Sequence, residues 1–146
     1  MSQPVQLEYI DSTGARKPVG FTSNSQLITK DYADSASDWQ YAAAASGIVN
    51  TTTAVTVKTA AAAGVRNYIT GITISHDLLS AVTELVIRDG AAGTVIYREK
   101  LQTAANEGRN IVFPTPLKGT AATLLEVATL TAVTGGVYVN IQGYSA

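Results

Sequence analysis

The segment ELVIRDGAAGTVIYR, residues 84–98, carries the strongest structural signal in this 146-residue sequence. Leu85 and Ile87 alternate with the charged residues Glu84 and Arg88. A period of two is typical of a strand with one buried and one wetter face. The turn-forming run DGAAG, residues 89–93, separates this strand from a second β-rich run at 94–98. The segment therefore predicts a β-hairpin.

The same alternation recurs through residues 39–146. Short β-rich runs lie at 55–58, 68–75, 111–113 and 137–144, with turn signals between them. Many short strands at such spacing are typical of a β-sandwich or barrel. We therefore predict an all-β fold, an antiparallel β-sandwich over residues 39–146. Residues 124–130 and 137–144, separated by a turn at 131–136, predict a second hairpin.

Two further features bear on the strands. Pro114 and Pro116 lack an N–H for the hydrogen-bond ladder, so we expect them to end a strand or to lie at a sheet edge. Residues 1–38 are polar and weakly patterned, and only residues 5–10 resemble a short strand. A segment with so few apolar residues cannot build its own core. We interpret it as an N-terminal arm, packed either on its own domain or on a neighbouring subunit.

Composition excludes several classes of function. Ten basic and eleven acidic residues give a formal net charge of -1, without a Lys/Arg run, so we expect no nucleic-acid partner. The chain contains no cysteine, which excludes disulfides, thiol nucleophiles and cysteine-ligated metals. The N-terminus has no signal-peptide pattern, and the uncharged stretch 127–146 alternates and is broken by glycines, so we expect no membrane span.

Catalytic groups are sparse. The single histidine, His76, precedes Asp77, but neighbours on a strand point to opposite faces and would not pair. The acidic residues Asp31, Asp34 and Asp38 do not match the spacing of a calcium loop. We therefore expect no enzyme activity, no catalytic or metal-binding residues and no cofactor, although spatial pairing of the carboxylates at positions 84, 89, 99 and 126 stays open.

The single tryptophan, Trp39, stands where the arm meets the domain. Three interpretations are open: it closes one end of the sandwich core, it lies in a subunit interface, or it belongs to an aromatic platform that stacks on sugars. The low charge of the domain favours association with other proteins, because little electrostatic repulsion opposes contact. Sandwich edges also need covering or pairing.

Several strings resemble small structural proteins of tailed bacteriophages. They are WQYAA (39–43), GIVNTT (47–52), RNYITGI (66–72), FPTPLKG (113–119) and VYVNIQGY (137–144). In this order they resemble the jelly-roll-like β-sandwich of head decoration (cement) proteins. The resemblance covers residues 39–146 and leaves the arm uncovered.

The resemblance implies a non-enzymatic virion protein on the outer surface of the head, made in the host cytoplasm. Its partners would be two further copies, in a homotrimer, and the major capsid protein. On this hypothesis we assign subunit or capsid contacts to seven apolar and aromatic residues: Leu7, Tyr9, Phe21, Leu27, Ile28, Tyr32 and Trp39. The alternative is a tail-associated or carbohydrate-binding β-sandwich module. A β-sandwich hydrolase using His76 is a third hypothesis.

Overall fold

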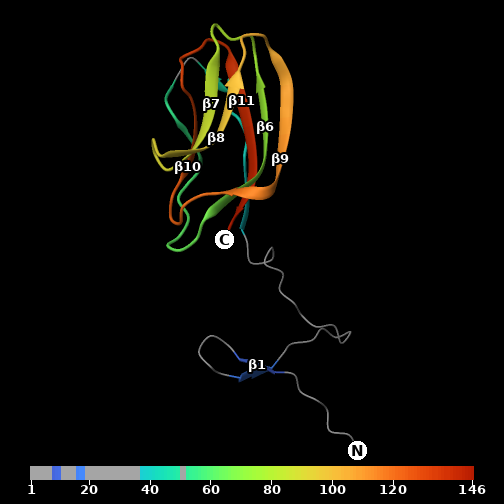
Figure 1. Cartoon of the computed structure of the whole chain (residues 1–146), viewed down its shortest axis with the longest axis vertical. Helices are drawn as coiled ribbons and strands as arrows, with labels where there is room; N and C mark the ends of the chain where they lie inside the picture. The colour runs from blue at the N-terminus through green and yellow to red at the C-terminus, as the bar shows by residue number, and fades with distance from the viewer. Residues whose placement is uncertain (1–7, 11–15, 19–36, 50–51) are drawn as a thin grey trace, which may run out of the picture. The chain divides into compact units, whose positions relative to one another are not determined.

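A computed structural model describes residues 8–10, 16–18, 37–49 and 52–146 of the chain (Figure 1). The chain divides into two units, residues 1–35 and 36–146. In the first unit, β1 (Glu8–Ile10) and β2 (Arg16–Pro18) form an antiparallel pair. The strand expected at residues 5–10 is therefore present as β1, and the first residues of that range lie outside the described part.

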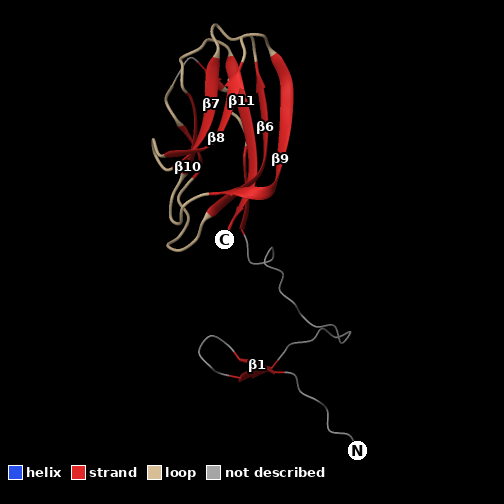
Figure 2. Ribbon diagram, in the orientation of Figure 1, coloured by secondary structure: helices blue, strands red, loops and turns tan. Residues whose placement is uncertain are grey.

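The second unit consists of two antiparallel sheets, and the described residues contain no helix (Figure 2). One sheet has the order β5-β10-β7-β8 and the other the order β3-β11-β6-β9, with the short strand β4 also paired to β11. The strand bounds are β3 (Ser37–Tyr41), β4 (Ile48–Val49), β5 (Val55–Lys58), β6 (Asn67–His76), β7 (Thr83–Asp89), β8 (Thr94–Leu101), β9 (Asn106–Lys118), β10 (Leu125–Thr129) and β11 (Gly136–Ser145). The predicted antiparallel β-sandwich is confirmed.

The connections between the eight longer strands follow the jelly-roll pattern. Successive strands lie in opposite sheets throughout, except that β7 and β8 are neighbours in one sheet. This order produces two Greek keys, the arrangement of a double-sheet jelly roll. The β6–β7, β8–β9 and β10–β11 loops gather at one end of the sandwich, and the C-terminus lies at the other (Figure 1).

The predicted hairpin at 84–98 is confirmed as β7 and β8, which pair from Thr83–Leu101 to Asp89–Thr94. Leu85 and Ile87 are fully buried between the sheets, as their alternation predicted. The loop bends back over the outer face of its sheet, where the Ala92 amide donates to the Glu126 carboxylate at 2.8 Å.

The predicted second hairpin is wrong in its pairing, although both of its strands exist. β10 pairs with β5 and β7, whereas β11 pairs with β3, β4 and β6. Alternation identifies a strand but not its partner. A six-residue link suits either a hairpin or a crossing to the second sheet about 10 Å away. Here it crosses, because each strand already has neighbours on both sides.

The two prolines lie where the sequence predicted, on the edge strand β9. This strand pairs only with β6, and its register jumps from Val112–Gly71 to Leu117–Ile69. Residues 113–116 therefore bulge opposite a single residue of β6. Because the ladder is interrupted there, the missing N–H groups of Pro114 and Pro116 cost no strand pairing.

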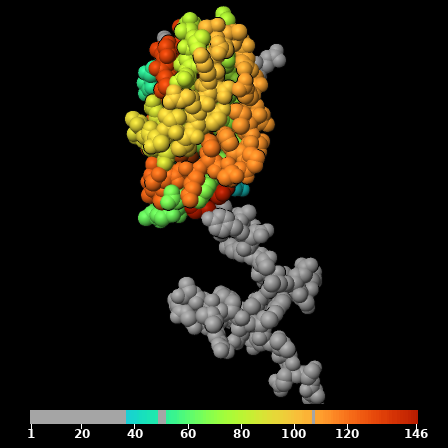
Figure 3. Space-filling view, in the orientation of Figure 1, coloured from blue at the N-terminus to red at the C-terminus, as the bar shows by residue number. Residues whose placement is uncertain are grey.

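Contacts between the sheets close both open edges of the sandwich. At one edge, Tyr97 of β8 meets Phe113 of β9 edge to face, with ring centroids 5.9 Å apart. Beside them, Arg109 of β9 forms an ion pair with Glu99 of β8. The space-filling view shows the yellow atoms of β8 adjoining the orange atoms of β9 over this edge (Figure 3). At the opposite edge, Lys58 of β5 lies 5.6 Å from the ring centroid of Trp39 in β3.

β3 begins at Ser37, so it includes two residues that the sequence assigned to the arm. Ser37 pairs with Ser145 and Asp38 with Tyr144 of β11. Both side chains are exposed, Asp38 on the outer side of the sheet and Ser37 at the open end of the strand. Their polarity therefore reflects a solvent-facing strand position, which in sequence resembles a loop.

Candidate binding face

The outer face of the β3-β11-β6-β9 sheet is a polar surface that carries two adjoining hollows. Along β11, Val137, Val139 and Ile141 are buried against the second sheet. The residues between them therefore point outward, because successive side chains alternate across a strand. The outward positions of this sheet are occupied mostly by amide and hydroxyl side chains, with tyrosines along β11.

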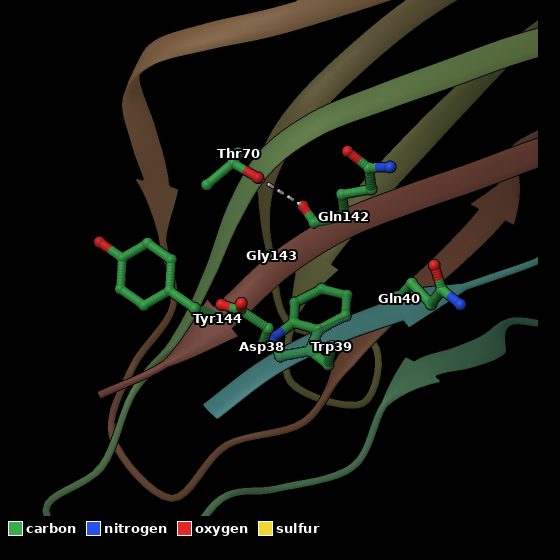
Figure 4. A pocket seen from close by; sticks show the side chains of 7 residues that line it. All are labelled: Asp38, Trp39, Gln40, Thr70, Gln142, Gly143 and Tyr144. Carbon is green, nitrogen blue, oxygen red and sulfur yellow. Dashed lines mark hydrogen bonds between the residues drawn. The ribbon is translucent and has the colours of Figure 1, made fainter. Parts of the chain in front are cut away.

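A hollow of about 500 Å³ lies on this face where β3, β11 and β6 run side by side (Figure 4). Its lining consists of Asp38, Trp39, Gln40, Thr70, Gln142, Gly143 and Tyr144. The Thr70 hydroxyl donates to the main-chain carbonyl of Gln142 at 3.2 Å and so ties β6 to β11 at the floor. This bond leaves the side-chain amide of Gln142 directed away from Thr70 (Figure 4).

A second hollow of about 270 Å³ adjoins the first and shares Thr70 and Gln142 with it. It extends toward β9, where Asn110 and Val112 line it together with Asn140 of β11. The Asn140 side-chain oxygen accepts from the Ala43 amide at 3.0 Å, which fixes the amide plane. The two hollows together cross all four main strands of this sheet.

A stacked pair of tyrosines borders the first hollow. The rings of Tyr68 in β6 and Tyr144 in β11 lie 4.8 Å apart with an interplanar angle of 11°. The two residues are direct partners across the strands. Cross-strand stacking restricts both rings, so Tyr144 presents a rigid wall to the hollow.

The lining of the two hollows has almost no charge. Among the residues that line the two hollows, Asp38 is the only one that carries a charge at neutral pH. Such a surface offers hydrogen bonds to neutral polar groups and gives an anion no compensating positive charge.

Trp39 lies in the core-packing position rather than on this face. Its side chain packs against the buried cluster from the edge, and its indole Nε1 is buried without a hydrogen-bond partner in the described structure. Trp39 lines the hollow together with Gly143, its direct partner across β3 and β11. The indole therefore packs on the core at an edge of the sandwich and not at its end, where one of the three interpretations placed it, and the Lys58 ammonium lies over its ring.

The other predicted contact residues belong to the first unit. Tyr9 lies in β1, where its backbone pairs with Lys17. The remaining five, Leu7, Phe21, Leu27, Ile28 and Tyr32, lie outside the described residues. Their assigned contacts with a neighbouring subunit or a capsid stay predictions.

His76 and Asp77 do not pair, as the strand geometry predicted. His76 is buried at the end of β6, where its Nδ1 lies 2.9 Å from the main-chain oxygen of Asp77. Asp77 turns outward, and its carboxylate accepts from the Gly136 amide at 3.1 Å and from the Tyr138 hydroxyl at 3.3 Å. Asp77 therefore anchors the start of β11.

The four scattered carboxylates do not come together in pairs. Glu84 contacts Arg98, Glu99 contacts Arg109, and Glu126 contacts Arg88 at 3.3 Å. Asp89 accepts from the backbone amide and the hydroxyl of Thr120. Of the calcium candidates, Asp38 lies on β3, and Asp31 and Asp34 are outside the described residues. Within the described ranges, no three His, Asp or Glu side chains gather as a metal site would require.

Sequence reasoning identified the strands of this face but not the face itself. The outward residues of 137–144 were visible as the polar half of an alternating pattern. Their neighbours from residues 38–40, 70–73 and 110–112 are distant in sequence, and only the strand order brings them together. In the part of the chain that the structure describes, no helix is long and apolar enough to cross a membrane.

Comparison of the chain with models of known protein families, with curated proteins and with solved structures found no match. The function is therefore argued from the geometry of the chain itself. The fold and the face define a jelly-roll domain with a polar, nearly uncharged sheet surface.

Proposed function

We propose that this chain is a non-enzymatic virion structural protein that decorates the outer surface of a capsid and stabilises it. The proposal keeps the partners that the phage-protein resemblance implied, two further copies of the chain and the major capsid protein. The feature that carries it is an exposed apolar end on a jelly-roll domain. Jelly rolls recur in viral coat proteins and in lectins, so the fold is compatible with the proposal without selecting it.

The apolar end consists of the β6–β7 and β10–β11 loops. Leu78 is 72% exposed, and Val82 and Leu130 are about 40% exposed. The two loops are bound to each other, since the Ser80 amide donates to the Thr134 carbonyl at 3.3 Å. The Leu130 amide donates to the carbonyl of Glu84 in β7 at 2.9 Å. Large apolar side chains gathered on a surface are typical of a site for protein contact.

This apolar end lies opposite the point where the chain enters the sandwich. β3 starts at Ser37, beside Ser145 near the C-terminus, and the two loops lie at the other end of the strands (Figure 1). The domain therefore separates the attachment point of its N-terminal unit from its apolar surface. That separation suits a protein that makes contacts at two places.

The stabilising effect follows from mass action. A ligand that binds an assembled lattice and not its free subunits lowers the free energy of the lattice. Attachment through several copies adds avidity, because the second and third contacts form at a high effective concentration. No chemical step is needed for this function.

The test uses the purified full-length chain and heads of the phage that encodes it, stripped of surface proteins. We expect a solution mass of three chains of 15.2 kDa each by light scattering, with or without a chelator, and co-sedimentation with assembled heads but not with free capsid protein. Leu78→Ser should weaken head binding, whereas Val112→Ser, an equally exposed apolar residue on the sheet face, should not. Failure of the folded chain to bind heads overturns the proposal.

The alternative of a carbohydrate-binding or tail-associated module has an observation in its favour, the polar hollows on the β3-β11-β6-β9 sheet. A tail location predicts binding to purified tails and none to heads, so the same sedimentation experiment separates the two locations.

A further inference from the structure

We propose that the outer face of the β3-β11-β6-β9 sheet binds a neutral oligosaccharide. This activity goes beyond capsid decoration and does not depend on it. The site comprises the two adjoining hollows, with the amides of Gln40, Gln142, Asn110 and Asn140 as its main polar groups.

The side-chain chemistry matches the hydroxyl groups of a sugar. An amide side chain offers two N–H donors and a carbonyl acceptor, so it can donate to one hydroxyl and accept from its neighbour. Gln40 and Gln142 are exposed, and neither side chain has a hydrogen bond within the described part of the chain. Asn110 and Asn140 are held by Thr73 and by the Ala43 amide, respectively. The face thus combines two adaptable amides, Gln40 and Gln142, with the fixed amide of Asn140 and the amide of Asn110, which has one long hydrogen bond.

The charge of the face selects against anionic ligands. Neither hollow is lined by a lysine or an arginine, and Asp38 adds a negative charge at one end. Phosphate contacts, which dominate nucleic-acid binding, need basic side chains. An acidic sugar would also meet the Asp38 carboxylate without compensation. The electrostatic complement of this surface is therefore a neutral polar molecule.

The same face fits a folded protein partner less well than a sugar. Protein interfaces have an apolar or aromatic centre and a polar rim. Here the centre, formed by Thr70, Gln142 and Asn140, is polar, and Val112 is the one large exposed apolar side chain among the residues lining the hollows. A protein docked on it would have to desolvate many amides and hydroxyls for little apolar burial.

An aromatic side chain, Tyr144, borders the first hollow. Tyr144 is held by stacking on Tyr68. Its ring lies at the opposite end of the hollow from Gln40 (Figure 4). A rigid ring can pack against the C–H face of a sugar with little loss of side-chain entropy. Because strands lie about 4.8 Å apart, the four strands span roughly 14 Å between outer strand axes. This extent favours a chain of sugars over a single ring.

The experiment has two stages and uses the full-length chain. An array of neutral and acidic oligosaccharides of plant, animal and bacterial-surface types is screened first. The strongest neutral binder is then titrated into labelled protein while backbone amide signals are followed by NMR. We expect shifts concentrated at residues 38–40, 70–73, 110–112 and 140–144.

A double variant supplies the functional control. Gln40→Ala with Gln142→Ala should weaken the sugar affinity at least about tenfold, because both adaptable amides are lost. Gln102→Ala, an exposed glutamine in the β8–β9 loop, should leave it unchanged. The proposal is overturned by a blank neutral array, by preferential binding of acidic sugars, or by shifts outside the face. Head binding measured on the same double variant stays intact if the two functions are separate.

Discussion

Trp39 and Gly143 are direct partners across β3 and β11, and the indole of Trp39 occupies the space that a side chain at position 143 would need. A Cβ atom on Gly143 would lie 2.6 Å from Cζ2 of the indole and 2.0 Å from the main-chain oxygen of Tyr68. The glycine therefore allows the tryptophan to pack against the core while β11 approaches β6 closely.

The first prediction concerns this close approach. Gly143→Ala should lower the free energy of unfolding by about 2–3 kcal/mol, because backbone and indole must both shift. Chemical denaturation followed by circular dichroism measures the change. Gly71→Ala is the matched control in the same sheet, since its nearest atom lies at an ordinary 3.4 Å and little loss is expected. Equal losses in both variants would contradict the steric explanation.

The second prediction concerns the edge between β3 and β5. The Lys58 ammonium over the Trp39 ring should contribute about 0.5–1 kcal/mol. Lys58→Met keeps most of the apolar stem and removes the charge, so its loss of stability isolates this term. A double-mutant cycle with Trp39→Leu measures the coupling. A coupling energy of zero would mean that Lys58 merely lies near the ring.

The third prediction concerns alkaline pH. Burial, followed by the hydrogen bond from Tyr97 to Glu99, raises the pKa of Tyr97 from 10.0 to about 12. The folded state then holds this proton more tightly than the unfolded state. The resulting stability is complete below pH 10 and is lost as the pH rises from 10 to 12.

Tyr97→Phe removes that pH-dependent part. Between pH 10 and 12 the unfolding free energy of the wild type should therefore fall more steeply than that of the variant. Denaturation midpoints collected across this range provide the comparison. Parallel curves would show that Tyr97 titrates normally in the folded protein.

The fourth prediction concerns Asn67, a fully buried amide at the start of β6. Its Nδ2 donates to the carbonyls of Thr59 and Thr123 at 3.1 Å each, and its Oδ1 accepts from the Ser145 hydroxyl at 2.7 Å. Asn67→Ala should cost at least about 2 kcal/mol, because buried polar groups lose their partners.

Asn110→Ala is the matched control for that change. Asn110 is exposed on the outer face and makes one long side-chain hydrogen bond, 3.4 Å from Thr73. Its replacement should alter thermal stability little. If the two variants have the same melting temperature, the hydrogen bonds of Asn67 to Thr59, Thr123 and Ser145 do not stabilise the fold as we expect.

Two pairs of strands show how much of the strand pairing could be predicted from the sequence. The hairpin of β7 and β8 was predictable, because a short turn at residues 89–93 brings the two flanking strands side by side. The link between β10 and β11 has a similar appearance but crosses to the other sheet. The distinction depends on which edges the remaining strands leave free, and no local pattern contains that information.

The composition of the candidate binding face could likewise not be predicted from local sequence patterns. The outward residues of β11 are visible as an alternating pattern, yet their partners Gln40, Thr70 and Asn110 come from three other strands. Trp39 stood out as the single tryptophan, but its place at a sandwich edge required the register with Gly143.

The sequence by itself determined that residues 39–146 form antiparallel strands with one apolar side, since alternation and turn residues act over a few neighbours. It also determined the low content of charged residues and the net charge of -1, because composition does not depend on folding. Only the tertiary structure decided which strands pair beyond the β7–β8 hairpin, which edges Trp39 and Arg109 close, and which polar side chains share a surface. Those outcomes depend on contacts between residues far apart in the chain, whose energies exist only once both sheets have formed.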